Sequence, residues 1–314
     1  MKMLCIGMMV CDTLLSPVPS NILTLGSVRI DKPSVCCGGD ALNVAIGLAK
    51  LGNSVSVAGR VARDANGKFI LNECNKYGIH ASGVVYEEEC ATAASYALID
   101  ENGERHFLSE KSIFEKLSGE DISDEAIEEA DMIYIGSAMA MRKMDEGGIK
   151  DVFLRAHRLG KMTVMDAAYN LEDPERDWLS YLAPAFMETD VFFPSMDEAV
   201  KITGQTDPEL IAECFKKFPM KAFGIKMGAK GCFVTDFKEK RFIKCPEGLP
   251  VVDTTGAGDS FMAGLMTGLA RGLDVFSGSE FASCVASKNV GSIGGTAGIP
   301  DYKEAFDLYQ SFYK

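Results

Sequence analysis

The sequence predicts an α/β protein in which helices flank a central, mostly parallel β-sheet, with a small β-sheet attached to it. Residues 3–10 form a continuous apolar run, which is typical of a strand buried on both faces of a parallel sheet. From residue 120 onward, helical patterns alternate with short apolar strands, as in units joined by right-handed crossovers. No low-complexity linker divides the chain, so residues 1–314 are predicted to form one domain.

The composition excludes several classes of protein. A hydrophobic fraction of 47% and a charged fraction of 25% describe a folded globular chain. The net charge of −13 argues against a nucleic-acid or anionic-membrane surface. No apolar run approaches the roughly 20 residues that span a bilayer. The ten cysteines show no zinc-ligand spacing, and reduced thiols in a cytoplasmic protein are expected. Three histidines make a histidine-based metal site or triad improbable.

The first polar residue of interest is Asp12, just beyond the predicted strand 3–10. In open α/β sheets, ligands bind at the carboxyl ends of the strands, so Asp12 is a candidate contact for a substrate hydroxyl. An aspartate that forms a turn explains the position equally well. Residues 16–33 alternate apolar and polar side chains between prolines, which predicts edge strands outside the main sheet.

A helix is predicted to begin after Gly38-Gly39 and to end at Gly52. Asp40 and Asn43 are three residues apart and therefore share one side of its first turn. A carboxylate beside an amide suits a polyol ligand. Helix capping without any ligand is the simpler explanation of this segment taken alone.

The next segments predict a strand at 54–59, a polar turn at 60–67 and a helix at 68–77. Residues 94–99 and 105–108 then form a hairpin through the Asp-Glu-Asn-Gly turn at 100–103. With residues 16–33 this hairpin predicts a small β-sheet, formed by about 13–34 and 89–109, that acts as a lid. An ordinary surface hairpin is the alternative.

The αβ alternation that follows predicts four helix and strand pairs. The predicted helices are 124–130, 149–159, 179–186 and 208–218, and the predicted strands are 132–136, 163–166, 191–194 and 222–227. Asp197 and Glu198 lie at a helix start, where they either reach a metal-bound water or cap the helix. Residues 224–234 read as a strand, a glycine-rich turn and a second strand, a pattern common in hairpins.

The segment 252–264 reads as a glycine-rich turn that runs into a helix. A helix N-terminus carries unpaired N–H groups and a partial positive charge, so it suits a phosphate. Asp259 beside such a site is useful as a general base for a hydroxyl that attacks a phosphoryl group. The alternative is an aspartate that caps the helix.

Three motifs occur in a characteristic order: Gly38-Gly39-x-x-x-Asn43, Lys226-x-Gly228-x-x-Gly231, and DTTGAGDSF at 253–261. In these motifs, over essentially its whole length, the chain resembles the ribokinase-like PfkB family of carbohydrate kinases. The resemblance implies a ribokinase-like fold with a β lid over the sugar. It also implies ATP and Mg²⁺ as cofactors.

The resemblance also implies roles for individual residues. Asp259 matches the catalytic base, and Gly256, Ala257 and Gly258 match the anion hole for the transferring phosphoryl group. The positions that match sugar contacts are Asp12, Gly39, Asp40 and Asn43. Lys226, Gly228 and Gly231 match the nucleotide loop, and Glu198 matches a glutamate that reaches Mg²⁺ through water. Asp253 and Thr255 match positions that help bind a monovalent cation such as K⁺.

Three departures from the family pattern bear on the substrate. Asp40 stands where ribokinases commonly have lysine, which weakens the case for ribose. Ser195 replaces the asparagine of the NxxE element, which affects the magnesium and water network. Residues 165–170 lack the DPNxR pattern of several fructokinase and ketodeoxygluconate kinase relatives, so those substrates are less expected.

The sequence thus predicts an ATP-dependent kinase that phosphorylates a hydroxyl, expected to be a primary one, of a small carbohydrate. A nucleoside kinase on the same fold and a non-catalytic sugar- or nucleotide-binding regulator are the alternatives. A Rossmann dehydrogenase fails on position, because the GxG lies late in the chain and Asp259 follows it directly. Edge strands of a lid need covering, so a homodimer through the lid is expected.

Overall fold

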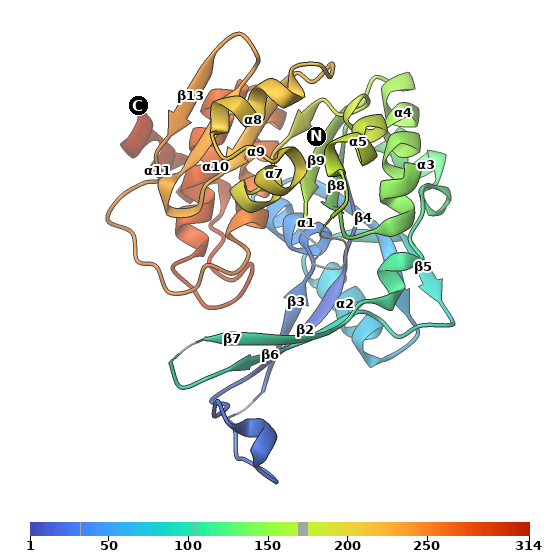
Figure 1. Cartoon of the computed structure of the whole chain (residues 1–314), viewed down its shortest axis with the longest axis vertical. Coiled ribbons are helices and arrows are strands. Elements are labelled where there is room, and N and C mark those ends of the chain that lie inside the picture. The colour runs from blue at the N-terminus through green and yellow to red at the C-terminus, as the bar shows by residue number, and fades with distance from the viewer. Residues whose placement is uncertain (32, 103, 169–174) are drawn as a thin grey trace.

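The computed structural model describes residues 1–31, 33–102, 104–168 and 175–314. Its centre is a nine-stranded sheet in the order β13-β12-β11-β10-β9-β8-β1-β4-β5 (Figure 1). The strands are β1 (Lys2–Ile6), β4 (Ser54–Ala62), β5 (His80–Glu87), β8 (Met132–Ala138), β9 (Met162–Ala167), β10 (Val191–Phe192), β11 (Ala222–Lys226), β12 (Cys232–Thr235) and β13 (Lys240–Ile243). The pairs from β5 to β11 are parallel, whereas β12 and β13 add as antiparallel strands.

Helices cover both faces of this sheet, and a separate hydrophobic core lies on each face. One face carries α1 (Asp40–Lys50), α2 (Ala65–Lys76), α9 (Ala257–Ala270), α10 (Val275–Asn289) and α11 (Tyr302–Tyr313). The other carries α3 (Asp124–Glu129), α4 (Ile149–Arg158), α5 (Trp178–Tyr181), α6 (Ala183–Phe186), α7 (Met196–Thr203) and α8 (Pro208–Phe215). Successive strand residues point to opposite faces, so Met3 packs into the first core and Leu4 into the second. The apolar run of β1 is therefore explained by burial on both sides.

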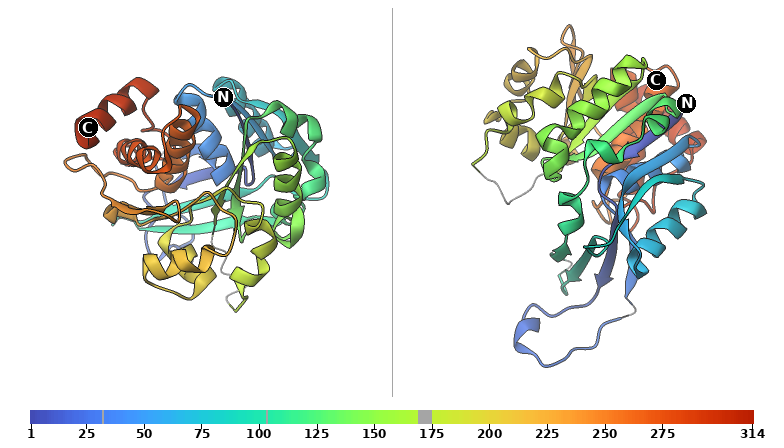
Figure 2. Two further views of the ribbon diagram at one scale, coloured as in Figure 1. Left: turned by 90° about the horizontal axis from the view of Figure 1, so that it is seen from above. Right: turned by 90° about the vertical axis from the view of Figure 1, so that its right-hand side faces the viewer.

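A second sheet of four strands projects from this body, in the order β3-β2-β6-β7 (Figure 2). Its strands are β2 (Val10–Leu15), β3 (Ser34–Gly38), β6 (Ala94–Ile99) and β7 (Arg105–Glu110). β2 pairs antiparallel to β3 and parallel to β6, and β7 closes the hairpin with β6. The predicted hairpin is thus confirmed, although Gly103 of its turn lies outside the described residues.

The prediction for the N-terminal region was wrong in two respects. The run 3–10 is not one strand, because the chain leaves β1 at Ile6 and passes through Gly7 at φ 147° before β2 begins. Asp12 therefore lies inside a strand of the small sheet, which also excludes a turn-forming role for it. The described part of 16–33 holds a single 3₁₀ turn at Ile22–Thr24 instead of edge strands. Pro17, Pro19 and Pro33 cannot donate ladder hydrogen bonds, which fits this outcome.

Most of the other predicted elements are present, with local differences. β4 extends to Ala62, and α2 begins three residues before its predicted start because Asp64 accepts a hydrogen bond from Gly67 N. The predicted helix 179–186 is divided into α5 and α6, where Pro184 opens a new helical turn. β5, β13, α10 and α11 were not predicted. Within the described residues, no helix is both long and apolar enough to cross a membrane.

Candidate active site

A cavity of about 620 Å³ opens at the carboxyl-terminal edge of the large sheet. It is lined by the last residues of β9 and β11, the first turn of α9 and the C-terminal part of α10. The predicted site residues that it brings together are Asp40, Glu198, Lys226, Gly228, Gly231, Ala257, Gly258 and Asp259. Motifs from the two ends and the middle of the chain therefore meet at one place.

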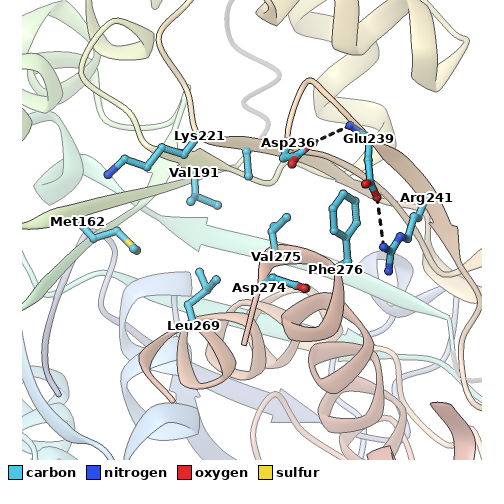
Figure 3. A pocket seen from close by; sticks show the side chains of 11 residues that line it. Met162, Val191, Lys221, Asp236, Glu239, Arg241, Leu269, Asp274, Val275 and Phe276 are labelled. Atoms are coloured by element: carbon cyan, nitrogen blue, oxygen red, sulfur yellow. Dashed lines mark hydrogen bonds and ion pairs between the residues drawn. The ribbon is translucent and has the colours of Figure 1, made fainter. Parts of the chain in front are cut away.

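A second cavity, of about 440 Å³, lies at the opposite edge of the sheet (Figure 3). Met162, Val191 and Ala222, the first residues of three parallel strands, form part of its wall. None of the predicted site residues lines it. The chemistry predicted from the motifs therefore belongs to the carboxyl-terminal edge.

The turn before α9 has the geometry expected of an anion site. Gly256 is the N-cap of the helix at φ 71°, and a Cβ there would lie 2.0 Å from Gly295 O. Only glycine fits this position, so the backbone can turn directly into the helix. Ala257 and Gly258 then place the first turn of a 14-residue helix at the cavity, where its N–H groups and dipole favour negative charge.

Asp259 does not cap this helix, because it is the third helical residue and Gly256 occupies the N-cap. Asn43 Nδ2 donates a hydrogen bond to Asp259 Oδ2 at 2.9 Å, across 216 positions of the sequence. Burial raises the pKa of Asp259, and the Asn43 hydrogen bond and the Lys226 charge offset only part of that effect. A carboxylate with a raised pKa beside an anion site can accept a proton from a hydroxyl.

Asp40 is held from two sides at the start of α1. Its Oδ1 accepts from Ala41 N at 2.7 Å and from the Ser137 hydroxyl. Gly39, at φ 82°, is the N-cap, and no side chain caps the helix, so the capping interpretation of Asp40 and Asn43 was wrong. The Asp40 Oδ2 atom is buried with no hydrogen-bond partner among the described residues. Burial, reinforced by the Asp259 charge, raises the pKa of Asp40 to about 7.

Ser137 is a site residue that the sequence prediction missed. It lies in β8 at φ 62°, an uncommon conformation for a residue other than glycine. Its hydroxyl donates to Asp40 Oδ1 and accepts from Met8 N at 3.3 Å. The only feature of the sequence that could have indicated Ser137 is the position of a serine at the end of an apolar strand.

Asp12 approaches the same group of carboxylates from the small sheet. Gly38 in the neighbouring strand makes room for it, because a Cβ on Gly38 would lie 2.1 Å from Asp12 Oδ2. Burial, with a contribution from the Asp259 charge, raises the pKa of Asp12 to about 6. The small sheet thus contributes an acidic group to a site that is otherwise built on the large sheet.

Lys226 ends β11 and forms an ion pair with Asp166 near the end of β9. The two side chains are 13% and 3% exposed, so the pair is largely removed from solvent. Burial alone would lower the pKa of Lys226, but Asp166 and Glu198 together raise it above its usual value. Asp166 is the second residue that the sequence prediction missed, although it ends an apolar strand. Tyr169 and Asn170, which the motif comparison also used, lie outside the described residues.

The loop predicted to bind the nucleotide contains a tight 3₁₀ turn, Gly228–Lys230. Gly231 at φ 89° closes it, and a Cβ there would lie 1.9 Å from Ile243 O. Gly228 at φ 58° has open space around its Cα and lines the cavity. The turn therefore leaves backbone exposed where a ligand could approach.

Glu198 caps the helix, which is one of the two roles that the sequence left open. Its Oε2 accepts from Ser195 N at 2.7 Å, and its own N–H donates to Ser195 Oγ at 3.3 Å, which forms a capping box on α7. Glu198 also lines the cavity. Within the described chain, no three acidic, histidine or cysteine side chains group tightly enough to hold a metal ion. Oxygen donors of this kind suit Mg²⁺ that keeps its waters and binds substrate phosphates.

Asp253 and Thr255 lie behind the anion site and do not line the cavity. Asp253 accepts from Thr255 N at 2.9 Å and from Gly294 N at 2.8 Å. These bonds tie the turn before α9 to the segment after α10. A carboxylate has further lone pairs, so this arrangement remains compatible with a bound cation.

Comparisons with known proteins agree with this geometry. The model of the family described as pfkB family carbohydrate kinase matches residues 2–302. The ribokinase of Bacillus subtilis (strain 168) is 27% identical over 279 residues, covering 86% of this chain and 87% of that protein. The fructokinase of Xylella fastidiosa with bound ATP superposes with a TM-score of 0.85 at 20% identity, covering 100% of this chain and 99% of that one. A putative ribokinase II of E. coli, solved with ATP and Mg²⁺, gives 0.85 at 19% identity over 99% of each chain.

These structures share the predicted ribokinase-like fold, with its large, mostly parallel sheet and small separate sheet. The family model spans nearly the whole chain and includes every motif of the cavity. The chain belongs to the pfkB family of carbohydrate kinases.

Proposed function

We propose that this carbohydrate kinase uses Asp259 as the general base in transfer of the γ-phosphoryl group of ATP to a sugar hydroxyl, a primary one. The observation that carries the proposal is the position of Asp259 in the first turn of α9, at the cavity and hydrogen-bonded to Asn43. The acceptor oxygen forms a bond to phosphorus while its proton moves to Asp259. The bond from phosphorus to the bridging oxygen of ADP breaks at the same time.

The acceptor lies between α1, the start of α9 and the small sheet in this proposal. The carboxylates of Asp12 and Asp40 accept hydrogen bonds from its hydroxyls, and the amide of Asn43 either accepts or donates one. Gly39 allows close approach of the backbone. Two features support this arrangement: the unpartnered Asp40 Oδ2 and the convergence of Asp12 and Asp259. A buried acceptor without a partner is costly unless a ligand satisfies it.

The donor lies along the other half of the cavity. Lys226, Gly228 and Gly231 bind the nucleotide, while the N–H groups of Gly256, Ala257 and Gly258 stabilise the transferring phosphoryl group. Glu198 would hold Mg²⁺ through water, and the ion would neutralise charge on the phosphates. Asp253 and Thr255 would bind a monovalent cation, K⁺, and so steady the turn before α9. Dialysis against K⁺-free buffer, followed by assays with K⁺ or tetramethylammonium, measures this last requirement.

The small sheet, formed by β2, β3, β6 and β7, acts as a lid in this proposal. Its closure over the acceptor excludes water and limits wasteful ATP hydrolysis. The lid also pairs with that of a second copy, in a homodimer. ATP as the donor and ten free thiols favour a cytoplasmic location.

A screen for ADP release tests the function. Purified protein is incubated with ATP and Mg²⁺ and with pentoses, hexoses, sugar acids or nucleosides in turn, and ADP is measured by a coupled assay. Acceptor-dependent ADP release from a sugar supports the proposal, and release only with adenosine or inosine assigns a nucleoside kinase instead. If no acceptor raises ADP release above the rate of ATP hydrolysis alone, the protein is assigned as a non-catalytic binding protein.

The variant Asp259→Asn tests the role of the base. Asparagine keeps the size and the hydrogen bond from Asn43 but cannot accept the proton. We expect a normal melting temperature and a turnover lower by roughly 10²- to 10⁴-fold, the range typical of general-base loss. Turnover close to that of the wild type would contradict the assignment.

A further inference from the structure

The side chain of Lys226 reaches the anion site itself. A Cβ built on Gly258 would lie 3.4 Å from Lys226 Nζ, which is its nearest neighbour. The ammonium group is therefore beside the first turn of α9, next to Asp259. Lys226 is also charge-coupled to Glu198 and Asp259, whose carboxylates line the same cavity.

Backbone hydrogen bonds fix the position of the Lys226 main chain, from which its side chain extends. Lys226 N donates to Pro194 O at 2.9 Å, and Lys226 bridges Ser195 beyond the end of β10. Asp166 is the penultimate residue of β9, which is separated from β11 by β10 alone. The ion pair thus spans the carboxyl edge of three neighbouring parallel strands, so the ammonium position is set by the sheet and not by a mobile loop.

A structural role explains this pair poorly. Removing two charges from water costs several kcal/mol, and apolar replacements of buried ion pairs are often as stable or more stable. The pair lines the cavity instead of filling a core, and the charges of three carboxylates, Asp166, Glu198 and Asp259, act on one ammonium group. Surplus negative charge at a site that must receive phosphates needs a cation at the point of transfer.

We propose that Lys226 is a catalytic residue whose Nζ contacts the transferring phosphoryl group of ATP, and that Asp166 is the positioning residue that holds it there. This inference rests on the proposed kinase function. Lys226 keeps its protons throughout: the acceptor proton goes to Asp259, and the electron pair of the broken bond stays on ADP. The lysine supplies charge at the equatorial oxygens, while Asp166 fixes its direction.

The variants Lys226→Met, Lys226→Arg and Asp166→Asn test the inference, with Lys221→Met as the matched control. Lys221 also pairs with a buried aspartate, Asp190, at 3.1 Å, but it lies at the opposite edge of the sheet. We expect kcat of Lys226→Met to fall by roughly 10²- to 10³-fold, as for loss of a transition-state contact, with the KM of the acceptor changed less than about threefold. Lys221→Met should retain wild-type kcat.

Asp166→Asn distinguishes positioning from simple stability. The ammonium group loses its main partner, so its pKa falls and the alkaline limb of the kcat profile should move to lower pH, with kcat reduced by roughly 10-fold or more. Melting temperatures of all variants control for folding. If Lys226→Met does not fold, Lys226→Arg still answers the question, because the bulkier guanidinium should keep the charge but lose at least about 10-fold in kcat.

Binding provides a readout independent of turnover. Calorimetry compares Mg·ADP alone with Mg·ADP plus aluminium fluoride, which mimics the phosphoryl group in flight, in the presence of the best acceptor from the screen. Because Lys226 contacts the transferring phosphoryl group of the nucleotide and not its ADP part in this inference, Lys226→Met should bind Mg·ADP within about threefold of the wild type yet lose most of the tightening that fluoride gives. An active wild type together with unchanged kcat and unchanged tightening in Lys226→Met overturns this inference alone. A wild type that phosphorylates no acceptor overturns the proposed function and this inference together.

Discussion

At the scale of single residues, like charges gather at one end of the large sheet. Asp12 and Asp40 both have a pKa raised by burial and by the charge of Asp259. An ionised carboxylate whose pKa is raised by burial lowers the free energy of unfolding. Natural proteins keep groups of this kind mainly at functional sites. The ionised carboxylates should therefore serve catalysis while they lower the stability of the fold. Asp40→Asn tests the effect on stability, and Asn43→Leu tests the effect on catalysis.

Asp40→Asn should stabilise the protein, and more so at higher pH. The pKa of Asp40 is about 7 in the folded state against 3.8 ordinarily, so the folded state favours the protonated form. The stability linked to that proton is fully present below the ordinary pKa and is lost as the pH rises through about 7. Asparagine carries no charge at any pH and can still accept from Ser137 and Ala41 N.

We therefore expect the melting temperature of Asp40→Asn to exceed that of the wild type by several degrees at pH 8, and by little at pH 4.5. At pH 8 this gain corresponds to an increase in the free energy of unfolding on the order of 1–4 kcal/mol. Asp197→Asn, at an exposed position of α7, is the control and should show no such trend. A gain in melting temperature that is equal at both pH values would argue against this account of Asp40.

Asn43→Leu should change the pH dependence of catalysis. The amide of Asn43 stabilises the ionised form of Asp259 and so lowers its pKa. Without that hydrogen bond, the pKa of Asp259 rises further. The acidic limb of the kcat/KM profile should then move to higher pH. A profile that is only lower, with its limb unmoved, would mean that Asn43 acts on the acceptor alone.

The residues predicted from sequence and those missed differ in a physical way. Asp259, Lys226 and the glycines lie in local motifs whose spacing carries information. Ser137 and Asp166 act through partners 97 and 60 positions away, and only the folded sheet shows that they meet. The capping box of Ser195 and Glu198 was a purely local alternative, and it is present in the structure.

At the scale of elements, the site depends on how closely α1 and α9 approach. Gly47 of α1 faces Ala263 of α9, and a Cβ on Gly47 would lie 2.7 Å from the Ala263 Cβ. These helices carry Asn43 and Asp259 at their first turns. The missing side chain at Gly47 therefore sets the separation that allows the 2.9 Å hydrogen bond between them.

Gly47→Ala should push the two helices apart and lower both stability and turnover. Overpacking of this kind costs about 1–3 kcal/mol, against a gain of up to about 1 kcal/mol in helix propensity. We expect turnover to fall by roughly 10-fold, because small displacements of catalytic groups are expensive. Adding Ala263→Gly removes the clash, so the double variant should recover turnover relative to Gly47→Ala. Additive losses in kinetics and thermal denaturation would show that the contact does not control the site.

Helix and strand types were predicted well in the αβ units between residues 124 and 227, where the apolar pattern is regular, whereas α10 and α11 were not predicted. The prediction failed where one backbone position decided the outcome. Gly7 divides an unbroken apolar run, because only its φ of 147° lets the chain leave one sheet and enter another. A Cβ there would also lie 3.2 Å from the Cβ of Ala41. Composition alone gives no sign of such a position.

At the scale of the whole molecule, the small sheet has two different faces. Register places Asp12 in one row with Ser95 and Ser109, on the face toward the acceptor side of the site. The next row on the other face contains Val35, Tyr96 and Leu108, which are 49%, 43% and 62% exposed. An apolar row on a projecting sheet favours contact with another protein surface.

A second copy of the chain is the partner we propose for this row, because two identical apolar faces can pair about a two-fold axis and cover each other. Leu108→Asp should then convert the dimer to a monomer, since a carboxylate buried at the centre of such a contact has no partner. Phe107→Asp is the matched control: the neighbouring residue is 58% exposed but belongs to the opposite face, so the dimer should persist. Sedimentation equilibrium measures both masses. A wild type that sediments as a monomer, or equal dissociation by both variants, would rule out pairing through this face.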